Sequence, residues 1–305
     1  MITRHLLGKT TWVDLESPTT DELTSVLKEF SIDERVRDEM NSPTPYPLTV
    51  AFPGYVYMIM HFPVSGTDEG ARSQEVDFIV GKQFVITTRY EVIDTIHTLH
   101  KVVEAEELIG TPSKANRTGE LLERILRRLY AAVSDEIEQA GRKLERIETD
   151  IFAGKERQTV RTISELARVL LRFDTALARH EEPLTDFLAI LGAPGLLGTT
   201  FDEHAARIEA RRVHTVSLVA SLRAVCQELR ITNDSLLSSS QNQVMKTLTI
   251  MAFVTFPLTL ISSMFGMNTE FLPIVGVPGD FWYIIAIMTT LAVGFFLFFR
   301  FKKWL

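Results

Sequence analysis

The hydrophobic pattern of the first 110 residues is one of short apolar runs separated by turn residues. Residues 17–22 and 33–40 carry capping residues and early acids, which predict the starts of two helices. Gly81-Lys82 separates two of the apolar runs and is a hairpin signal. Runs rich in β-branched and aromatic residues predict strands at 12–15, 55–62, 76–80 and 84–88. Together they predict a small mixed sheet with helices packed on it.

Between residues 118 and 188 the apolar positions recur near the helical period of 3.6, and Glu and Arg fill the other face. Gly154 divides this region, so one helix is expected before it and a second over 156–188. The glycine-rich stretch 192–195 marks a loop. Alternating charges on two long helices indicate a solvent-exposed helical hairpin and not a catalytic cleft.

A third helix is expected to start near Phe201, because no Pro or Gly follows until Pro257. Through Phe265 it would hold about 65 residues, or roughly 95 Å at 1.5 Å per residue. Such a rod is typical of a stalk that couples a soluble domain to a membrane pore.

Two uncharged stretches of 19 residues, 247–265 and 281–299, predict transmembrane helices, because about 20 residues cross a hydrocarbon core of roughly 30 Å. Lys246 precedes the first span, and basic residues follow the second within 300–305. The intervening 266–280 has no Lys or Arg. The positive-inside rule therefore places both termini in the cytoplasm and 266–280 outside the cell membrane, inner or plasma.

Charge narrows the function classes. The net charge of −7 belongs almost wholly to residues 1–246, which argues against nucleic-acid binding. Cys226 is the single cysteine, so neither an intrachain disulfide nor a cysteine-based zinc site is expected. The residues after Met1 form no apolar run, so a cleavable signal peptide is not expected. No phosphate loop, HExxH, GxSxG or dinucleotide fingerprint is present, so we expect neither an enzyme nor a cofactor.

Gly266-Met267-Asn268 follows the first span directly, and Pro257-Leu258-Thr259 lies inside that span. With the final span and the basic end Lys302-Lys303-Trp304-Leu305, this arrangement resembles the GMN-containing CorA family of magnesium and cobalt transporters. The resemblance implies a funnel-shaped homopentamer in the lipid bilayer that takes up Mg²⁺, with Co²⁺ and Ni²⁺ as further divalent cations. The expected division is an N-terminal α/β cytoplasmic domain (1–115), its helical hairpin (116–200), a stalk continuing into the pore helix (201–265), an outer loop (266–280), a second span (281–299) and a basic cytoplasmic tail (300–305).

The resemblance implies that one face of the first span lines the pore and that Gly266, Met267 and Asn268 form the selectivity motif. Asn268 would contact the cation through its hydration shell, and Gly266 would let the helix end turn sharply. Stepping by three and four residues from Asn242 gives the pore-lining set, which carries no charge: Asn242, Met245, Thr249, Ala252, Phe256, Thr259 and Ser263. Neutral oxygens suit hydrated Mg²⁺, which gives up its water reluctantly. Several copies are needed, since two helices cannot enclose a polar path.

Two acids of the outer loop, Glu270 and Asp280, are expected to concentrate cations. The regulatory acid that some family members carry near the start of the stalk falls by ungapped counting on Arg207, which cannot bind a cation. The regulatory site is therefore left unassigned.

Two alternatives stay open. A ZntB-like zinc transporter, which could be coupled to protons, would share this architecture. The histidines that bear on it, His97 with His100 and His180 beside Glu181, are interpreted as solvated helix faces, because no compact triad appears. In a different class, a membrane-anchored sensor or scaffold would use the helical rod without transport.

Overall fold

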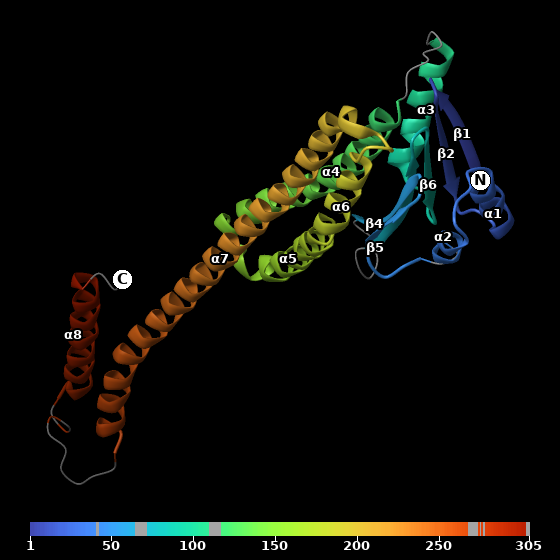
Figure 1. Ribbon diagram of the computed structural model, residues 1–305. Helices are drawn as coiled ribbons and strands as arrows, with labels where there is room; N and C mark the ends of the chain where they lie inside the picture. The colour runs from blue at the N-terminus through green and yellow to red at the C-terminus, as the bar shows by residue number, and fades with distance from the viewer. Residues whose placement is uncertain are drawn as a thin grey trace. The chain divides into compact units, whose positions relative to one another are not determined.

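The computed structural model is shown in Figure 1 and describes residues 1–40, 43–64, 72–109, 117–267, 274, 276 and 278–302. The chain divides into two compact units, Met1–Arg230 and Ile231–Leu305. We describe each by itself.

The first unit is built on a six-stranded mixed sheet in the order β1-β2-β6-β5-β4-β3. Only β2 and β6 pair in parallel, and every other neighbouring pair is antiparallel. The strands are β1 (Ile2–Leu7), β2 (Thr10–Glu16), β3 (Leu48–Phe52), β4 (Tyr55–Val64), β5 (Arg72–Gly81) and β6 (Phe84–Arg89). The mixed sheet is confirmed, as is the β5–β6 hairpin that Gly81-Lys82 predicted.

Both faces of the sheet are buried, so its strands alternate between two cores. One core holds Val13, Tyr57 and Ile79 and is covered by α1 (Thr20–Glu29) and α2 (Glu34–Glu39). A capping box begins α1: the Thr19 hydroxyl accepts from the Glu22 amide, and the Glu22 carboxylate accepts from the Thr19 amide. The capping residues found in the sequence therefore start the two short helices, as predicted.

The other core packs Trp12, Phe78 and their neighbours against α3 and the long helices (Figure 1). These helices are α3 (Asp94–Ile109), α4 (Thr118–Phe152), α5 (Glu156–Ala178) and α6 (Glu181–Leu191). Gly154, at φ +81°, separates α4 from α5 as expected, because this left-handed conformation strains any residue with a Cβ atom.

The helix expected over 156–188 is divided, which corrects the sequence interpretation. α5 ends at Ala178 and α6 begins at Glu181. Pro183 explains the break: it has no amide hydrogen, and its ring would clash with the carbonyl four residues earlier in a continuous helix. In the first turn of α6 the missing amide costs nothing, since that group has no partner inside the helix.

α7 runs without interruption from Asp202 to Phe265, after a short 3₁₀ turn over Gly198–Phe201, and it belongs to both units. The unbroken helix that the sequence predicted is confirmed, with Pro257 inside it. α8 (Asp280–Phe301) completes the second unit. The helices Gly198–Phe265 and Asp280–Phe301 are each long and apolar enough to cross a membrane.

Candidate functional site

The seven candidate pore residues all lie on one face of the membrane-proximal half of α7, which we call the seam. Its steps of three and four residues keep Asn242 and Ser263, at its two ends, on the same side of the helix. Met245 is 60% exposed and Phe256 72% exposed, so the second unit leaves these large apolar groups uncovered. Among the other seam residues, Asn242, Thr259 and Ser263 are exposed, and Thr249 and Ala252 are half-buried.

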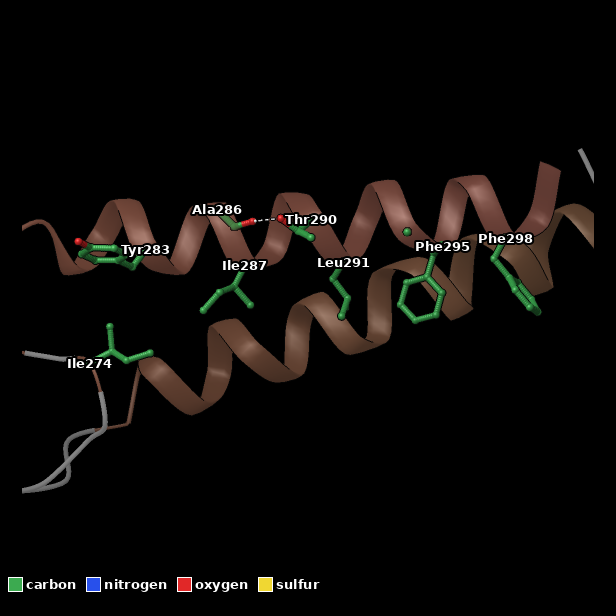
Figure 2. Close-up of a pocket in the computed structure, with 9 residues that line it drawn as sticks. Ile274, Tyr283, Ala286, Ile287, Thr290, Leu291, Phe295 and Phe298 are labelled. Atoms are coloured by element: carbon green, nitrogen blue, oxygen red, sulfur yellow. Dashed lines mark hydrogen bonds between the residues drawn. The ribbon is translucent and has the colours of Figure 1, made fainter. Parts of the chain in front are cut away.

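α8 lies beside α7 (Figure 2), and the buried and half-buried positions of α7 fall mainly on the face opposite the seam. Ile250 is buried there, and Val254, Pro257, Leu258, Ile261 and Phe265 are half-buried. At 3.6 residues per turn, the mean directions of the seam and of these six positions differ by roughly 160°. The buried Phe299 lies on α8. A single chain therefore covers one side of α7 and leaves the seam free for another partner.

The seam threonines use their hydroxyl hydrogens inside the helix. Thr249 donates to the Met245 carbonyl and Thr259 to the Thr255 carbonyl, each at 2.8 Å. Such bonds satisfy the hydroxyl hydrogen in an apolar span and leave the oxygen lone pairs pointing outward. Each threonine can therefore accept a hydrogen bond from a water molecule but does not need one.

Gly266 directly follows α7, and the sharp turn expected there stays a prediction. Its φ lies outside the left-handed region, and its amide still donates to the Ser262 carbonyl at 3.0 Å. Glycine is nevertheless favoured, because a Cβ atom here would lie 3.2 Å from that same carbonyl oxygen. Met267 is 56% exposed.

Of the two outer acids, Asp280 lies in the described part of the chain, in the first turn of α8. Asn268 and Glu270 lie outside the described residues. The Asp280 carboxylate accepts hydrogen bonds from the amides of Gly276 at 3.1 Å and Phe281 at 2.7 Å. Asp280 thus stabilises the start of α8, where a negative charge also suits the helix dipole.

A hollow in the second unit is not a cation site. It has a volume of about 970 Å³ and lies along α8 (Figure 2), lined by Ile274, Tyr283, Ala286, Ile287, Thr290, Leu291, Gly294, Phe295 and Phe298. No lining residue is charged, and the Thr290 hydroxyl already donates to the Ala286 carbonyl. Such a surface suits acyl chains or another apolar helix and offers nothing to a hydrated cation.

Arg207, the position to which ungapped counting led for the expected regulatory acid, forms ion pairs within its own chain. Its guanidinium lies 3.4 Å from Glu123 of α4 and 3.2 Å from Glu203. Glu123 also accepts from His204 at 2.6 Å and from Arg127 at 2.9 Å. Burial would raise the pKa of Glu123, but these hydrogen bonds outweigh it and lower the pKa.

The interpretation of the histidines as solvated helix faces is wrong for two of the three. His97 is exposed, but His100 is buried and lies between Asp14, at 2.8 Å, and His5, at 3.0 Å. His180 is fully buried between the Tyr130 hydroxyl, at 3.0 Å, and the His61 carbonyl, at 2.9 Å. In the described part of the chain, no three His, Cys, Asp or Glu side chains are placed to hold a metal ion.

The sequence missed the partners of these histidines because strands and helices far apart in the chain supply them. The one available signal was polar residues at inward-facing strand positions, such as Asp14 between Val13 and Leu15.

An α+β unit whose long last helix is itself the first of two apolar, membrane-length helices is the fold expected of a class of membrane transport protein. Residues 8–303 match the family described as CorA-like Mg²⁺ transporter protein, and the chain belongs to this family. It is a metal-ion transporter and not an enzyme.

Individual relatives are distant. The chain is 23% identical over 303 residues to the cobalt/magnesium transport protein CorA of Thermotoga maritima, covering 97% of this chain and 83% of that protein. The complete CorA magnesium transporter structure from Methanocaldococcus jannaschii matches with a TM-score of 0.80 at 22% identity, over 97% of this chain and 92% of that one. The ZntB cytoplasmic domain from Vibrio parahaemolyticus RIMD 2210633 matches with a TM-score of 0.61 at 12% identity, over 78% and 91%. These structural likenesses establish the fold.

Proposed function

We propose that the protein conducts hydrated Mg²⁺ through a homopentameric pore lined by the α7 seam, with a ring of Asn268 amides at its outer mouth. The observation that carries the proposal is the position of the seam, roughly opposite the face of α7 that α8 covers. Copies of α7 that met through their seams would form an inner ring, and the α8 helices would form an outer one.

The spacing of the seam supports assembly around an axis. Its alternating steps of three and four residues average 3.5, slightly less than one helical turn. Helices that keep such a seam facing their partners supercoil with a left hand. Two spanning helices cannot enclose a polar path, so several chains must supply the wall.

The chemistry of the seam fits an ion that keeps its water. The oxygens of Asn242, Thr249, Thr259 and Ser263 are neutral, so a ring of them hydrogen-bonds the hydration shell without holding the cation tightly. Phe256 and Met245 present exposed apolar groups between these oxygens and would form the narrow, poorly wetted parts of the pore.

Membrane orientation follows from the basic flanks of the two spans. Lys246 before the first span, and the basic residues after the second, favour a cytoplasmic position for both termini. The connection over 266–280 then lies outside the cell membrane, where Glu270 and Asp280 add negative charge near the pore mouth.

The test is Mg²⁺ entry into liposomes that contain the purified protein and a Mg²⁺-sensitive dye, with equal pH on both sides. We expect potential-driven entry that Asn268→Ala reduces by at least about tenfold, as removing a ring of five ligands should. Gln243→Ala is the matched control, because it removes an exposed amide from the opposite face of α7.

Other outcomes would replace the proposal. Zn²⁺ entry that requires a pH gradient, without Mg²⁺ entry, would establish the zinc transporter. Folded, oligomeric protein that passes neither ion would support the sensor or scaffold.

A further inference from the structure

Two acidic side chains of β5, Glu75 and Asp77, are buried on the α1–α2 face of the sheet. Asp77 is 0% exposed and Glu75 is 7% exposed. They stand two residues apart, so they lie on the same side of the strand. The transport path proposed above does not use them.

One oxygen of each carboxylate is bonded. Asp77 Oδ2 accepts from the Tyr57 hydroxyl at 3.2 Å and lies 3.5 Å from the Tyr90 hydroxyl. Glu75 Oε2 accepts from the Thr44 amide at 2.7 Å and from His61 Nε2 at 3.1 Å.

The other oxygen of each carboxylate, Asp77 Oδ1 and Glu75 Oε1, is buried and has no hydrogen-bond partner among the residues that the structure describes. The titratable groups around the pair are His61 and Tyr57 of β4 and Tyr90, which follows β6. At the end of α2, the Met40 carbonyl accepts from Tyr90. Within the described residues, no lysine or arginine forms an ion pair with either acid. Two adjacent buried carboxylates without a cation are costly when both are ionised.

A single proton resolves this arrangement. Shared between the two carboxyl groups, it would let one donate to the other and would remove one negative charge. The pKa of the Asp77 carboxyl agrees with this arrangement. Burial raises it well above its usual range, and the charge of Glu75 is the next largest cause.

The same cluster forms hydrogen bonds with Met40 and Thr44, which follow α2, and so connects them to the sheet. Tyr90 donates to the Met40 carbonyl at 2.9 Å, and the Thr44 amide donates to Glu75. The Thr44 carbonyl accepts from His61 Nε2 at 2.7 Å. The contacts at Met40 and Thr44 therefore depend on the positions of groups that surround the acid pair.

We propose that Glu75 and Asp77 share one proton, and that its loss to solvent as pH rises loosens the attachment of Met40 and Thr44 to the sheet. Ionising both acids places two negative charges side by side, and the pair relieves the repulsion by moving apart. The direction of the pH effect follows from the linkage between proton binding and opening of the cluster. The closed cluster holds the proton and the opened one releases it, so opening becomes easier as pH rises toward the raised pKa of Asp77.

The experiment measures hydrogen–deuterium exchange of the Thr44 amide in the full-length protein in detergent, from about pH 5 to about pH 9. Wild type is compared with Asp77→Asn at each pH, so that the intrinsic pH dependence of exchange cancels. Asparagine imitates the protonated acid: its amide nitrogen can donate to Glu75, and its oxygen can accept from Tyr57.

We expect exchange in wild type to rise relative to the variant by about tenfold for each pH unit between the ordinary and the raised carboxyl pKa. Asp38→Asn is the matched control, because it removes one exposed acid of α2 and should follow wild type. If Asp77→Asn does not fold, Glu75→Gln supplies the same donor from the other side.

Equal exchange in wild type and Asp77→Asn at every pH would overturn the proposal. So would a wild-type pH response that disappears in saturating Mg²⁺, since the pair would then hold a cation in place of the proton. Exchange does not require ion flux, so this outcome is independent of the proposed channel.

Discussion

The guanidinium of Arg89 lies 3.0 Å from the carboxylate of Asp14, and both side chains are at most 2% exposed. The pair joins β6 to β2, the only parallel neighbours in the described sheet. Asp14 also accepts from His100 of α3 and from Thr87. Burial would raise the pKa of Asp14, but the hydrogen bond from His100 and the charge of Arg89 outweigh it and lower the pKa.

Removing the guanidinium should therefore be costly. Arg89→Met leaves the Asp14 charge buried without its cation, so we expect the free energy of unfolding to fall by about 3–5 kcal/mol. Chemical denaturation measures it. Arg4→Met is the control, because Arg4 and Glu29 form an exposed pair whose loss should cost at most about 1 kcal/mol. Equal losses in the two variants would show that Asp14 does not depend on Arg89.

His180 should make the protein sensitive to acid. The His61 carbonyl can only accept, so Nε2 of His180 carries the hydrogen and Nδ1 accepts from Tyr130. Burial, as the main cause, lowers the pKa of His180 to about 4. The unfolded chain then binds more protons below about pH 6.5. The contribution of His180 to the free energy of unfolding is therefore complete above that pH. It is lost as pH falls toward 4, by roughly 3 kcal/mol in total.

Denaturation curves across this pH range check the His180 prediction. His180→Gln keeps one donor and one acceptor but cannot titrate, so its acid-dependent loss should be smaller than that of wild type. His97→Gln, which changes an exposed ring, should retain the wild-type loss. The same slope in all three proteins would assign the acid sensitivity to other groups.

Phe256 should limit the rate of ion flux if the seam lines the pore. It is 72% exposed in the single chain, and five rings would narrow and dewet the path. We expect Phe256→Ala to raise the rate of Mg²⁺ entry into liposomes roughly several-fold, because the smaller side chain widens the constriction and lets water fill it. Phe296→Ala, an exposed aromatic of α8, is the control and should leave entry unchanged. Faster entry in the α8 variant alone would place the path along α8.

Several elements could be predicted because local chemistry decides them. Gly154 ends a helix through its left-handed φ, and Thr19 begins one through its hydroxyl. The edge strands β1 and β3 have weaker hydrophobic patterns and were not predicted. The break between α5 and α6 was missed, although Pro183 was visible, because the apolar spacing continues past it.

The sequence by itself determined the two apolar spans, the uninterrupted α7 and the neutral seam, because each depends on residues close together in the chain. Only the tertiary structure decided which polar groups are buried. His180 looks like an ordinary surface residue in the sequence, and Asp14 and Asp77 stand out only through their apolar neighbours in the strands. Their partners arrive from strands and helices up to 119 residues away, as His180 and His61 do, and burial then fixes their protonation. The placement of α8 opposite the seam likewise required two helices to be packed together, since neither span alone shows which of its faces is covered.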